Sequence, residues 1–488
     1  MPDRIEDLEP KAVWSQFARI LEIPRPSKSE EKMAEHVLAL AKKRGAAAER
    51  DSAGNVVVRV PGTQGREKRP ITVLQSHLDM VCEKNASVEH DFTKDPIRPR
   101  IDGEWVAATG TTLGSDNGIG VAAALALLDE EKGKETPHGP LELLFTIDEE
   151  TGLTGAKSLS GKLLKGKRLL NLDSEEEGLL YIGCAGGCDT KLTFKPAPVP
   201  APPAGDAVRL TVSGLRGGHS GVQIHENRAN AIKILARWLL GALRAGTSFE
   251  VVRVAGGGKH NAIPREAAAD AILDSASAGA IKAHTEKLAK DLKDEFEGID
   301  DGLKLEVAPL QERPKRVLRS ADRDRLLRLV ESLPHGVLAM SPAVPGLVET
   351  SSNVAVVEPE DDHVVVWTSS RSSVAPALRA VLAQIRSIGE LAGFAVETAD
   401  GYPGWKPNPK SPLLATAQEV HKELTGKAAQ VAAIHAGLEC GLIGEIYPGM
   451  DMVSFGPTIE GPHSPDERVK IATVARFWDF LRALLAKL

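Results

Sequence analysis

The sequence is poor in the residues that characterise secreted and zinc-ribbon proteins. It has four cysteines and 4% aromatic residues in 488 positions. Only Cys184 and Cys188 are closely spaced, and a single CxxxC is neither a disulfide framework nor a zinc ribbon. We therefore expect a chain that works in the reducing cytoplasm, with these two thiols in its core.

Long apolar runs and an excess of positive charge are also missing. No run approaches the ~18–20 apolar residues that span a bilayer, and the N-terminus, MPDRIEDLEPKAVW, lacks the cationic and apolar regions of a secretion signal. The formal net charge is -7, so no broad basic field is available to hold phosphates. Nucleic acid and membrane are therefore not expected partners.

Three common catalytic signatures do not occur. The sequence contains no HExxH helix, no G-x-S-x-G elbow and no GxxxxGK[ST] loop. These absences exclude the metalloproteases, serine hydrolases and P-loop enzymes that those motifs mark.

The first part of the chain, residues 1–189, alternates between helical and strand-like patterns. Ser27 and Glu30 have the spacing of a capping box before a helix that ends near Gly45, and IGVAAALALLDEE predicts a second helix. Continuous apolar runs predict strands buried on both faces of a largely parallel sheet: NVVVRV, ITVLQSHLDMV, PLELLFTI and RLLNLD. We predict an α/β domain with helices on both faces of a mixed sheet.

The pattern changes after residue 190 and returns after residue 400. The Pro/Ala-rich stretch KPAPVPAPPAGD leads into an α+β pattern of the split βαβ type, and a weaker, similar order of elements follows it. The final part, residues 401–488, is α/β again. We predict one catalytic domain formed by residues 1–189 and 401–488, interrupted by an inserted α+β lid or dimerisation domain over 190–400 that contains two similar units.

Acidic and histidine side chains follow the predicted strands. In an open α/β sheet the carboxyl ends of the strands meet in one crevice, so these side chains are expected to converge. Imidazoles with several carboxylates suit zinc or manganese, and a dication relieves the repulsion among neighbouring acids. On its own, each pattern is also typical of a solvated turn or a local hydrogen bond. The residues are His77, Asp79, Asp116, Asp148, Glu149, Glu150, Asp173 and His463.

The motifs that contain these residues carry a resemblance to a known family. In order they are QSHLDM, GTTLGSDNGIG, FTIDEETG, NLDSEEEG, GLRGGHSG, GGKHNAIPRE, HAGLECG and SFGPTIEGPHSPDE. Together they resemble the bacterial aminoacyl-histidine dipeptidases, also called cytosolic non-specific dipeptidases, of the aminoacylase and carnosinase-like two-zinc peptidases. The resemblance extends over essentially the whole chain.

The resemblance implies a role for each residue of the predicted metal site. His77 and Asp173 would bind one metal ion, and Glu150 and His463 the other. Asp116 would bridge the two ions and precede a cis peptide bond to Asn117. Asp79 would orient His77, and Glu149 would be the general base. The implied cofactors are two divalent ions per chain: zinc, with manganese and cobalt as alternatives.

The resemblance also implies substrate-binding residues in the inserted domain and after it. His219 would stabilise the oxyanion and Asn261 would polarise the substrate. Arg371 would hold the dipeptide carboxylate through its guanidinium fork, and the alternative for it is a surface arginine after a strand. His435 and Glu439 would lie near the site. The family suggests a homodimer, and whether His219 serves its own or a neighbouring active site stays open.

The predicted function is hydrolysis of unblocked dipeptides, Xaa-His and β-alanyl-histidine included, by a water held between the metal ions. An aminoacylase or N-deacylase could use every one of the same ligands. A non-catalytic binding protein on a peptidase fold is the alternative from another class, although the ligands and the base are all present in this sequence. A two-metal phosphoesterase would require basic residues near the acids, and these segments contain few.

Overall fold

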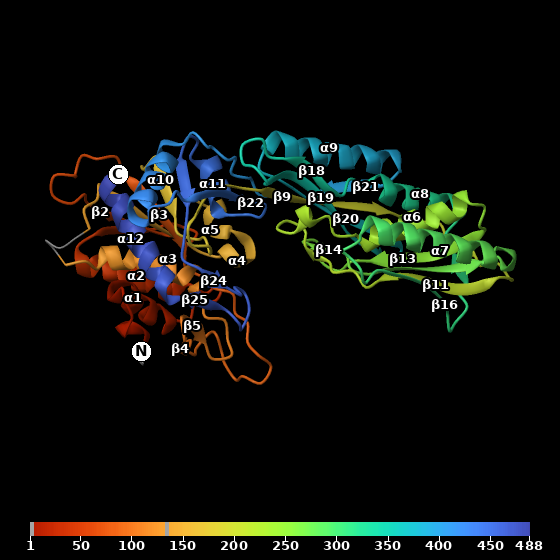
Figure 1. Cartoon of the computed structure of the whole chain (residues 1–488), viewed down its shortest axis with the longest axis horizontal. Coiled ribbons are helices and arrows are strands. Elements are labelled where there is room, and N and C mark those ends of the chain that lie inside the picture. The colour runs from red at the N-terminus through yellow and green to blue at the C-terminus, as the bar shows by residue number, and fades with distance from the viewer. Residues whose placement is uncertain (1–3, 132–135) are drawn as a thin grey trace. The chain divides into compact units, whose positions relative to one another are not determined.

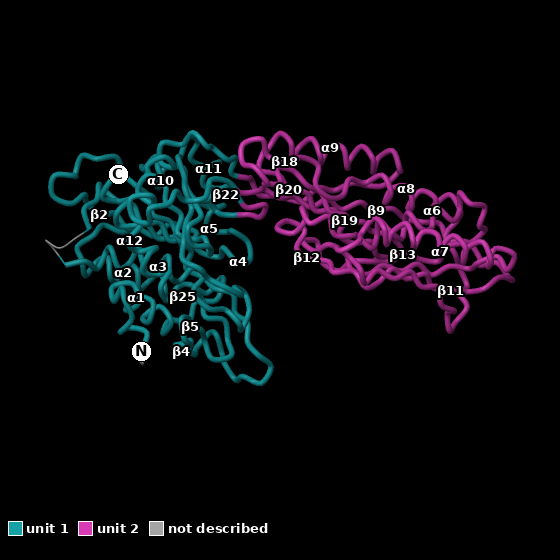
Figure 2. The backbone as a smooth tube through the Cα atoms, viewed as in Figure 1, with its two compact units in different colours: residues 1–183, 405–433, 438–488 teal, residues 184–404, 434–437 magenta. Residues whose placement is uncertain are grey.

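The computed structural model describes residues 4–131 and 136–488, which form two compact units (Figure 2). Unit 1 contains the chain up to Gly183, Trp405–Ala433 and Leu438–Leu488, and unit 2 contains Cys184–Gly404 and Ile434–Gly437. The observed boundaries at 183/184 and 404/405 lie within a few residues of the predicted ones at 189/190 and 400/401. The sequence did not predict that residues 434–437 belong to unit 2. The chain thus passes between the units four times.

Unit 1 is built on an eight-stranded mixed sheet with the order β1-β2-β6-β3-β7-β23-β8-β22. Figure 1 labels β2, β3 and β22 of this sheet. The four central strands β6, β3, β7 and β23 run parallel, whereas β1, β2 and β8 pair antiparallel. The sheet is mixed, as predicted, and the four strands in its middle are parallel. The strands are β1 (Ala47–Arg50), β2 (Val56–Val60), β3 (Thr72–His77), β6 (Leu141–Thr146), β7 (Arg168–Asn171), β8 (Leu179–Cys184), β22 (Gln430–Ile434) and β23 (Asp451–Ser454).

Every residue of β3 and β6 is buried, as expected for strands covered on both faces. A smaller four-stranded sheet joins β24 (Ile459–Glu460), β25 (Arg468–Lys470), β5 (Trp105–Ala108) and β4 (Pro99–Asp102). The predicted α/β class is confirmed. The helices of unit 1 are α1 (Lys11–Leu21), α2 (Glu31–Arg44), α3 (Ser115–Leu128), α4 (Glu149–Gly152), α5 (Thr154–Lys157), α10 (Pro412–Thr425), α11 (Glu439–Ile446) and α12 (Ile471–Lys487).

The predicted capping box before α2 is wrong. The helix ends near Gly45 as expected, with Gly45 as its C-cap, but its N-cap is Glu30, with no side-chain cap hydrogen bond. Ser27 instead donates its hydroxyl to Asp79 at 2.8 Å, and Glu30 accepts from the backbone N–H of Asp148 at 3.0 Å. These partners lie more than 50 residues away, so the local spacing gave no sign of them.

Unit 2 has a nine-stranded sheet with the order β16-β11-β15-β13-β19-β20-β9-β21, to which β18 adds by pairing with β19. Both halves of the predicted α+β insertion contribute strands to this one sheet. Its strands are β9 (Gly186–Phe194), β11 (Asp206–Ser213), β13 (Phe249–Gly256), β15 (Ala267–Leu273), β16 (Lys304–Pro309), β18 (Gly336–Met340), β19 (Val348–Glu360), β20 (His363–Ser372) and β21 (Ala395–Thr398).

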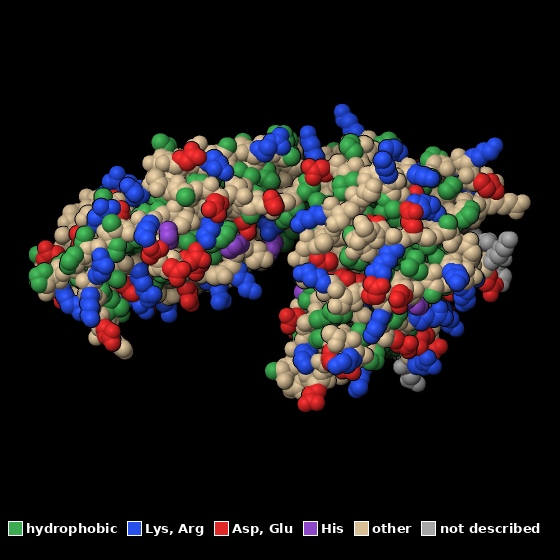
Figure 3. All heavy atoms as spheres, turned by 180° about the vertical axis from the view of Figure 1, so that it is seen from behind, with side chains coloured by type: hydrophobic (Ala, Val, Ile, Leu, Met, Phe, Trp, Pro, Cys, Tyr) green, Lys and Arg blue, Asp and Glu red, His purple; other side chains and the backbone are tan. Residues whose placement is uncertain are grey.

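The core of unit 2 packs α6, α7, α8 and α9 against this sheet, around the fully buried Trp238. Two short strands, β12 (Gly218–His219) and β14 (Ala262–Ile263), pair beside it. On the face that Figure 3 presents, acidic and basic side chains are interspersed in both units. The helices are α6 (Ala231–Arg244), α7 (Ala278–Glu295), α8 (Ser320–Ser332) and α9 (Ala375–Leu391).

Candidate active site

Part of the candidate metal site of unit 1 stands at the carboxyl ends of its parallel strands, whereas Asp116 lies in α3 and His463 follows β24. His77 is the last residue of β3 and pairs in register with Thr146, the last residue of β6. The Asp148–Glu150 acids follow β6, and Asp173 follows β7. Because parallel strands end at one edge of a sheet, residues far apart in the sequence meet there.

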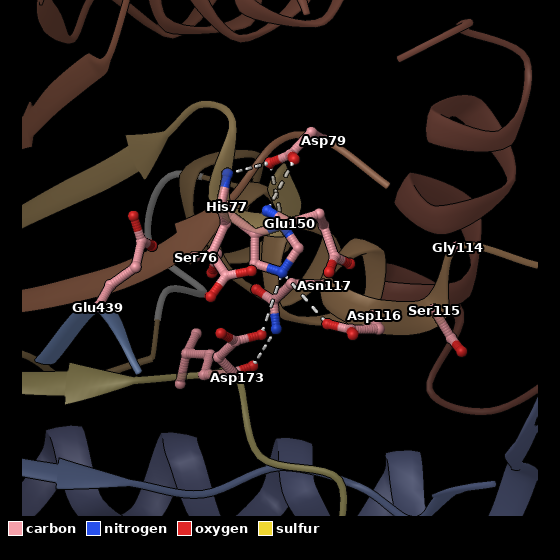
Figure 4. Close-up of polar contacts among 12 residues, drawn as sticks. Ser76, His77, Asp79, Gly114, Ser115, Asp116, Asn117, Glu150, Asp173 and Glu439 are labelled. Atoms are coloured by element: carbon pink, nitrogen blue, oxygen red, sulfur yellow. Dashed lines mark hydrogen bonds and ion pairs between the residues drawn. The ribbon is translucent and has the colours of Figure 1, made fainter. Parts of the chain in front are cut away.

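His77 lies at the centre of a buried cluster of acids (Figure 4). Its Nε2 atom is 3.2 Å from Asp116 Oδ1 and 3.3 Å from Asp173 Oδ1. Its Nδ1 atom is 3.3 Å from Asp79 Oδ1. One ring nitrogen therefore faces two carboxylates, while the other faces a third that fixes the orientation of the ring.

A second cluster forms around His463. Its Nε2 atom is 3.3 Å from Asp116 Oδ2 and 3.1 Å from Glu150 Oε2. Asp116 therefore directs one carboxylate oxygen to each histidine. The peptide bond from Asp116 to Asn117 is cis, as the sequence resemblance implied.

These donors fit a divalent cation. His77, Asp116 and Glu150 each offer one ligand atom, and these three atoms lie within 4.8 Å of one another. Glu150 Oε1 is buried without a hydrogen-bond partner in the described chain. Burial raises the pKa of Asp173 to about 7 and raises that of Glu149 well above its ordinary value. The cluster thus holds more buried negative charge than its own groups neutralise, and a cation would stabilise it.

Asp79 connects His77 to the turn that carries the acids. Its carboxylate accepts hydrogen bonds from Glu149 N at 3.0 Å, Glu150 N at 3.2 Å and Ser27 Oγ at 2.8 Å. Burial acts to raise the pKa of Asp79, but these donors and His77 outweigh it and lower the pKa to about 2. An ionised Asp79 therefore holds both a candidate ligand and the candidate base in place.

Sequence patterns left the part played by Glu439 open. This residue begins α11 and is fully buried. Its Oε2 atom accepts from Gln75 Nε2 at 2.5 Å and from Thr146 Oγ1 at 2.6 Å, and burial raises its pKa to about 8. The motif HAGLECG was the signal for it, because an acid inside an otherwise apolar segment requires buried partners.

The predicted substrate-binding residues lie in unit 2 and form a separate group. A Cβ atom on Gly221 would come within 2.4 Å of His435 O, 3.0 Å of His219 Cε1 and 3.2 Å of Arg371 Nε, so three of these residues meet there. Asn261 is held nearby, since its backbone carbonyl accepts a hydrogen bond from Ser220 N at 2.8 Å.

The charges of this second group differ from those of unit 1. Arg371 is buried, donates from Nη1 to the Tyr402 hydroxyl at 2.9 Å, and has no hydrogen-bond partner for Nε among the described residues. Burial and the Arg371 charge lower the pKa of His435 to about 3, and they also lower the pKa of His219. His435 Nε2 lies 2.7 Å from Ser351 Oγ. The positive charge of this second group therefore comes from the guanidinium of Arg371.

Among the residues that the structure describes, no helix is both long and apolar enough to cross a membrane.

The clustered imidazoles and carboxylates suit a divalent metal ion, and comparison with known proteins identifies the family. Residues 73–487 match the model of peptidase family M20/M25/M40. The chain belongs to this family and is a metal-dependent hydrolase.

Individual relatives extend this result over the whole chain. The cytosol non-specific dipeptidase of Escherichia coli (strain K12) is 43% identical over 484 residues, which is 99% of each chain. The crystal structure of aminoacylhistidine dipeptidase from Vibrio alginolyticus has a TM-score of 0.93 at 44% identity and covers 99% of this chain and 98% of that one. Aminopeptidase PepT from Bacillus cereus, at 16% identity and a TM-score of 0.57 over 98% and 99%, shares the fold.

Proposed function

We propose that this chain is a dinuclear-zinc dipeptidase that cleaves unblocked dipeptides, Xaa-His and β-alanyl-histidine included. The observation that carries the proposal is the Asp116 carboxylate, whose two oxygens lie 3.2 Å from His77 and 3.3 Å from His463. A carboxylate shared in this way suits a two-metal site. The names of the relatives from E. coli and V. alginolyticus support dipeptides as substrates.

The proposed ligands divide into two sets around Asp116. His77 and Asp173 would hold one ion, and Glu150 and His463 the other, with zinc favoured and manganese or cobalt as alternatives for such nitrogen and oxygen donors. When bound, the ions supply Lewis-acid polarisation of the scissile carbonyl and of the attacking water.

Glu149 is the proposed general base. It follows the strand that leads to the site, and Asp79 holds its backbone N–H at 3.0 Å, while Glu150 beside it faces His463. Glu149 therefore stays available to take the water proton and to deliver it to the leaving amine. Burial raises its pKa, which strengthens it as a base toward water.

In unit 2, the proposed substrate contacts are His219, Asn261, Arg371 and His435. Arg371 would bind the dipeptide carboxylate, since its Nε is buried without a partner among the described residues and a guanidinium fork matches two carboxylate oxygens. His219 would donate to the oxyanion. We further propose that unit 2 is a lid and dimerisation domain, that the protein is a homodimer and that it works in the cytoplasm, as the name of the E. coli relative indicates for that protein.

Hydrolysis by chelator-stripped protein, before and after addition of zinc or manganese, tests this function. The substrates are alanyl-histidine, β-alanyl-histidine, alanyl-alanine and N-acetyl-alanine, with metal counted per chain. Cleavage of dipeptides restored at about two metals per chain supports the proposal, and the ratio of the first and third substrates gives the preference for histidine.

The other results separate the alternatives. Cleavage of N-acetyl-alanine alone would favour a deacylase. Two bound metals with no cleavage of any substrate would favour a binding protein, and the absence of bound metal would overturn the proposed site.

A further inference from the structure

Two buried charged side chains outside the proposed ligand set hold the loop that leads to Asp116. Arg25 and Glu467 are each 2% exposed, and neither has a part in the proposed reaction. Both contact the backbone of residues 113–116, Arg25 through a carbonyl and Glu467 through N–H groups. A buried charge is costly unless it is compensated, so these contacts require an explanation.

Arg25 connects two of the site's segments. Its Nη1 atom donates to Leu78 O at 2.9 Å and to Asp79 O at 2.7 Å, directly after His77. Its Nη2 atom donates to Gly114 O. Gly114 has a φ of +72°, and a Cβ there would lie 2.5 Å from Arg25 Nη2. Glycine at this position therefore provides both the left-handed backbone and the space for the guanidinium.

Glu467 holds the same loop through its N–H groups. Its Oε2 atom accepts from Leu113 N and Gly114 N at 2.8 Å each. Its Oε1 atom accepts from Ser115 N at 2.7 Å, from Ser115 Oγ at 2.6 Å and from Asp116 N at 3.3 Å.

Glu467 is also tied to the segment that carries His463, because its own N–H donates to Ser464 O at 3.1 Å. It thereby joins the loop of the bridging acid to the loop of the second histidine. Arg25 does the same between the Asp116 loop and the segment after His77. The two charges also attract each other, so each offsets the burial of the other.

We propose that Arg25 and Glu467 are positioning residues that place Asp116 between His77 and His463 and so determine whether the site retains two metal ions. This proposal rests on the proposed function, because it takes Asp116 as the bridging ligand. Residues that support metal ligands typically change metal affinity by about 10- to 100-fold when they are replaced. We therefore expect replacement of Arg25 or Glu467 to lower the number of metal ions bound per chain, and to lower turnover as a consequence.

A structural role alone would predict a different result, and unit 1 offers two controls, a buried acid and a partly exposed arginine. Glu142 is a 2% exposed carboxylate that accepts from Lys165 N and Gly166 N. It lies near the start of β6, at the end of the strand away from the site. Arg168, at the start of β7, donates to the carbonyls of Pro70 and Leu488. Replacement of either removes backbone hydrogen bonds of the same kind without touching the Asp116 loop.

The experiment compares Glu467→Gln and Arg25→Lys with Glu142→Gln and Arg168→Lys in the full chain. Zinc per chain and the affinity of each zinc ion are measured by competition with a chromophoric chelator, and the melting temperature is recorded without metal. We expect Glu467→Gln and Arg25→Lys to weaken the second zinc ion by about 10- to 100-fold, and excess zinc to restore part of kcat. A glutamine replaces one carboxylate oxygen by an NH₂ group, which cannot accept from an N–H donor, so the loop loses part of its hydrogen bonds.

Two outcomes overturn the proposal while leaving the proposed function intact. Wild-type zinc affinity in both Glu467→Gln and Arg25→Lys is the first. The second is an equal loss of zinc in the two control variants. A wild-type chain without two zinc ions would instead refute the proposed function. If Glu467→Gln does not fold, Ser115→Ala removes one of the five hydrogen bonds and should still weaken the second ion, and unchanged affinity there would also count against the proposal.

Discussion

The two groups of polar side chains, one in each unit, have opposite electrostatic character. In unit 1, burial, with a smaller contribution from neighbouring carboxylates, raises the pKa of Glu149 well above its ordinary value and that of Asp173 to about 7. In unit 2, Arg371 is buried and the pKa of His435 is lowered to about 3. The first group suits a cation and the second an anion, so each can be tested by removing the charge that defines it.

The largest expected effect comes from removing the shared acid of unit 1. Asp116→Ala should lower the metal content below two ions per chain and reduce kcat/KM by at least about 1,000-fold, since both histidines lose their common carboxylate. Elemental analysis and dipeptide hydrolysis measure the two effects. Retention of two ions per chain would remove the bridging role.

Glu149→Gln should separate catalysis from metal binding in the same unit. We expect normal metal content and a fall in kcat of about 100- to 10,000-fold, the range for loss of a general base. Stopped assays on the zinc-loaded variant measure turnover. Near-normal kcat would show that another group accepts the proton.

Arg371→Ala should affect the anionic end of the substrate alone. A hydrogen bond to a charged group contributes about 1.5–3 kcal/mol, so kcat/KM for a dipeptide should fall about 10- to 150-fold, with metal content unchanged. Dipeptide amides, which lack the carboxylate, should lose much less. Arg209→Ala, which breaks a partly buried pair with Asp270 in the same unit, is the control, and equal losses on acids and amides would contradict the clamp.

The smallest effect concerns the acid stability of unit 2. The pKa of His435 is lowered from 6.5 to about 3, so below pH 6.5 the unfolded chain takes up a proton that the folded chain does not. The contribution of His435 to the unfolding free energy is complete above that pH. It is lost as the pH falls toward 3, with a slope of about 1.4 kcal/mol per pH unit.

His435→Asn should therefore make the unfolding free energy less steep between pH 6 and about 4, as measured by urea denaturation of metal-free protein. The exposed His225 of the same unit provides the control, His225→Asn. A slope in His435→Asn as steep as that of the wild type would show that this imidazole does not control acid sensitivity.

The features that sequence patterns predicted are those with a local or repeated signal. The α/β class followed from buried apolar runs such as those of β3 and β6, and the convergence of His77 and Asp173 followed from the common edge of parallel strands. Asp116 reaches the same place from the start of α3. Sequence could not assign Ser27, Glu30, Arg25 or Glu467, because their partners lie far along the chain and a charged residue in a loop is usually solvated. The capping box failed for this reason, since Ser27 and Glu30 bond to residues of other segments.

The four passages of the chain between the units have a consequence for dissection of the protein. A gene fragment encoding only Cys184–Gly404 would contain His219, Asn261 and Arg371 but would lack Ile434–Gly437. Ser351 would then lose His435, its partner at 2.7 Å. Any excised version of this unit must therefore carry the tetrapeptide back on an artificial linker, and a library that shuffles such units between relatives must exchange two separate stretches of DNA together.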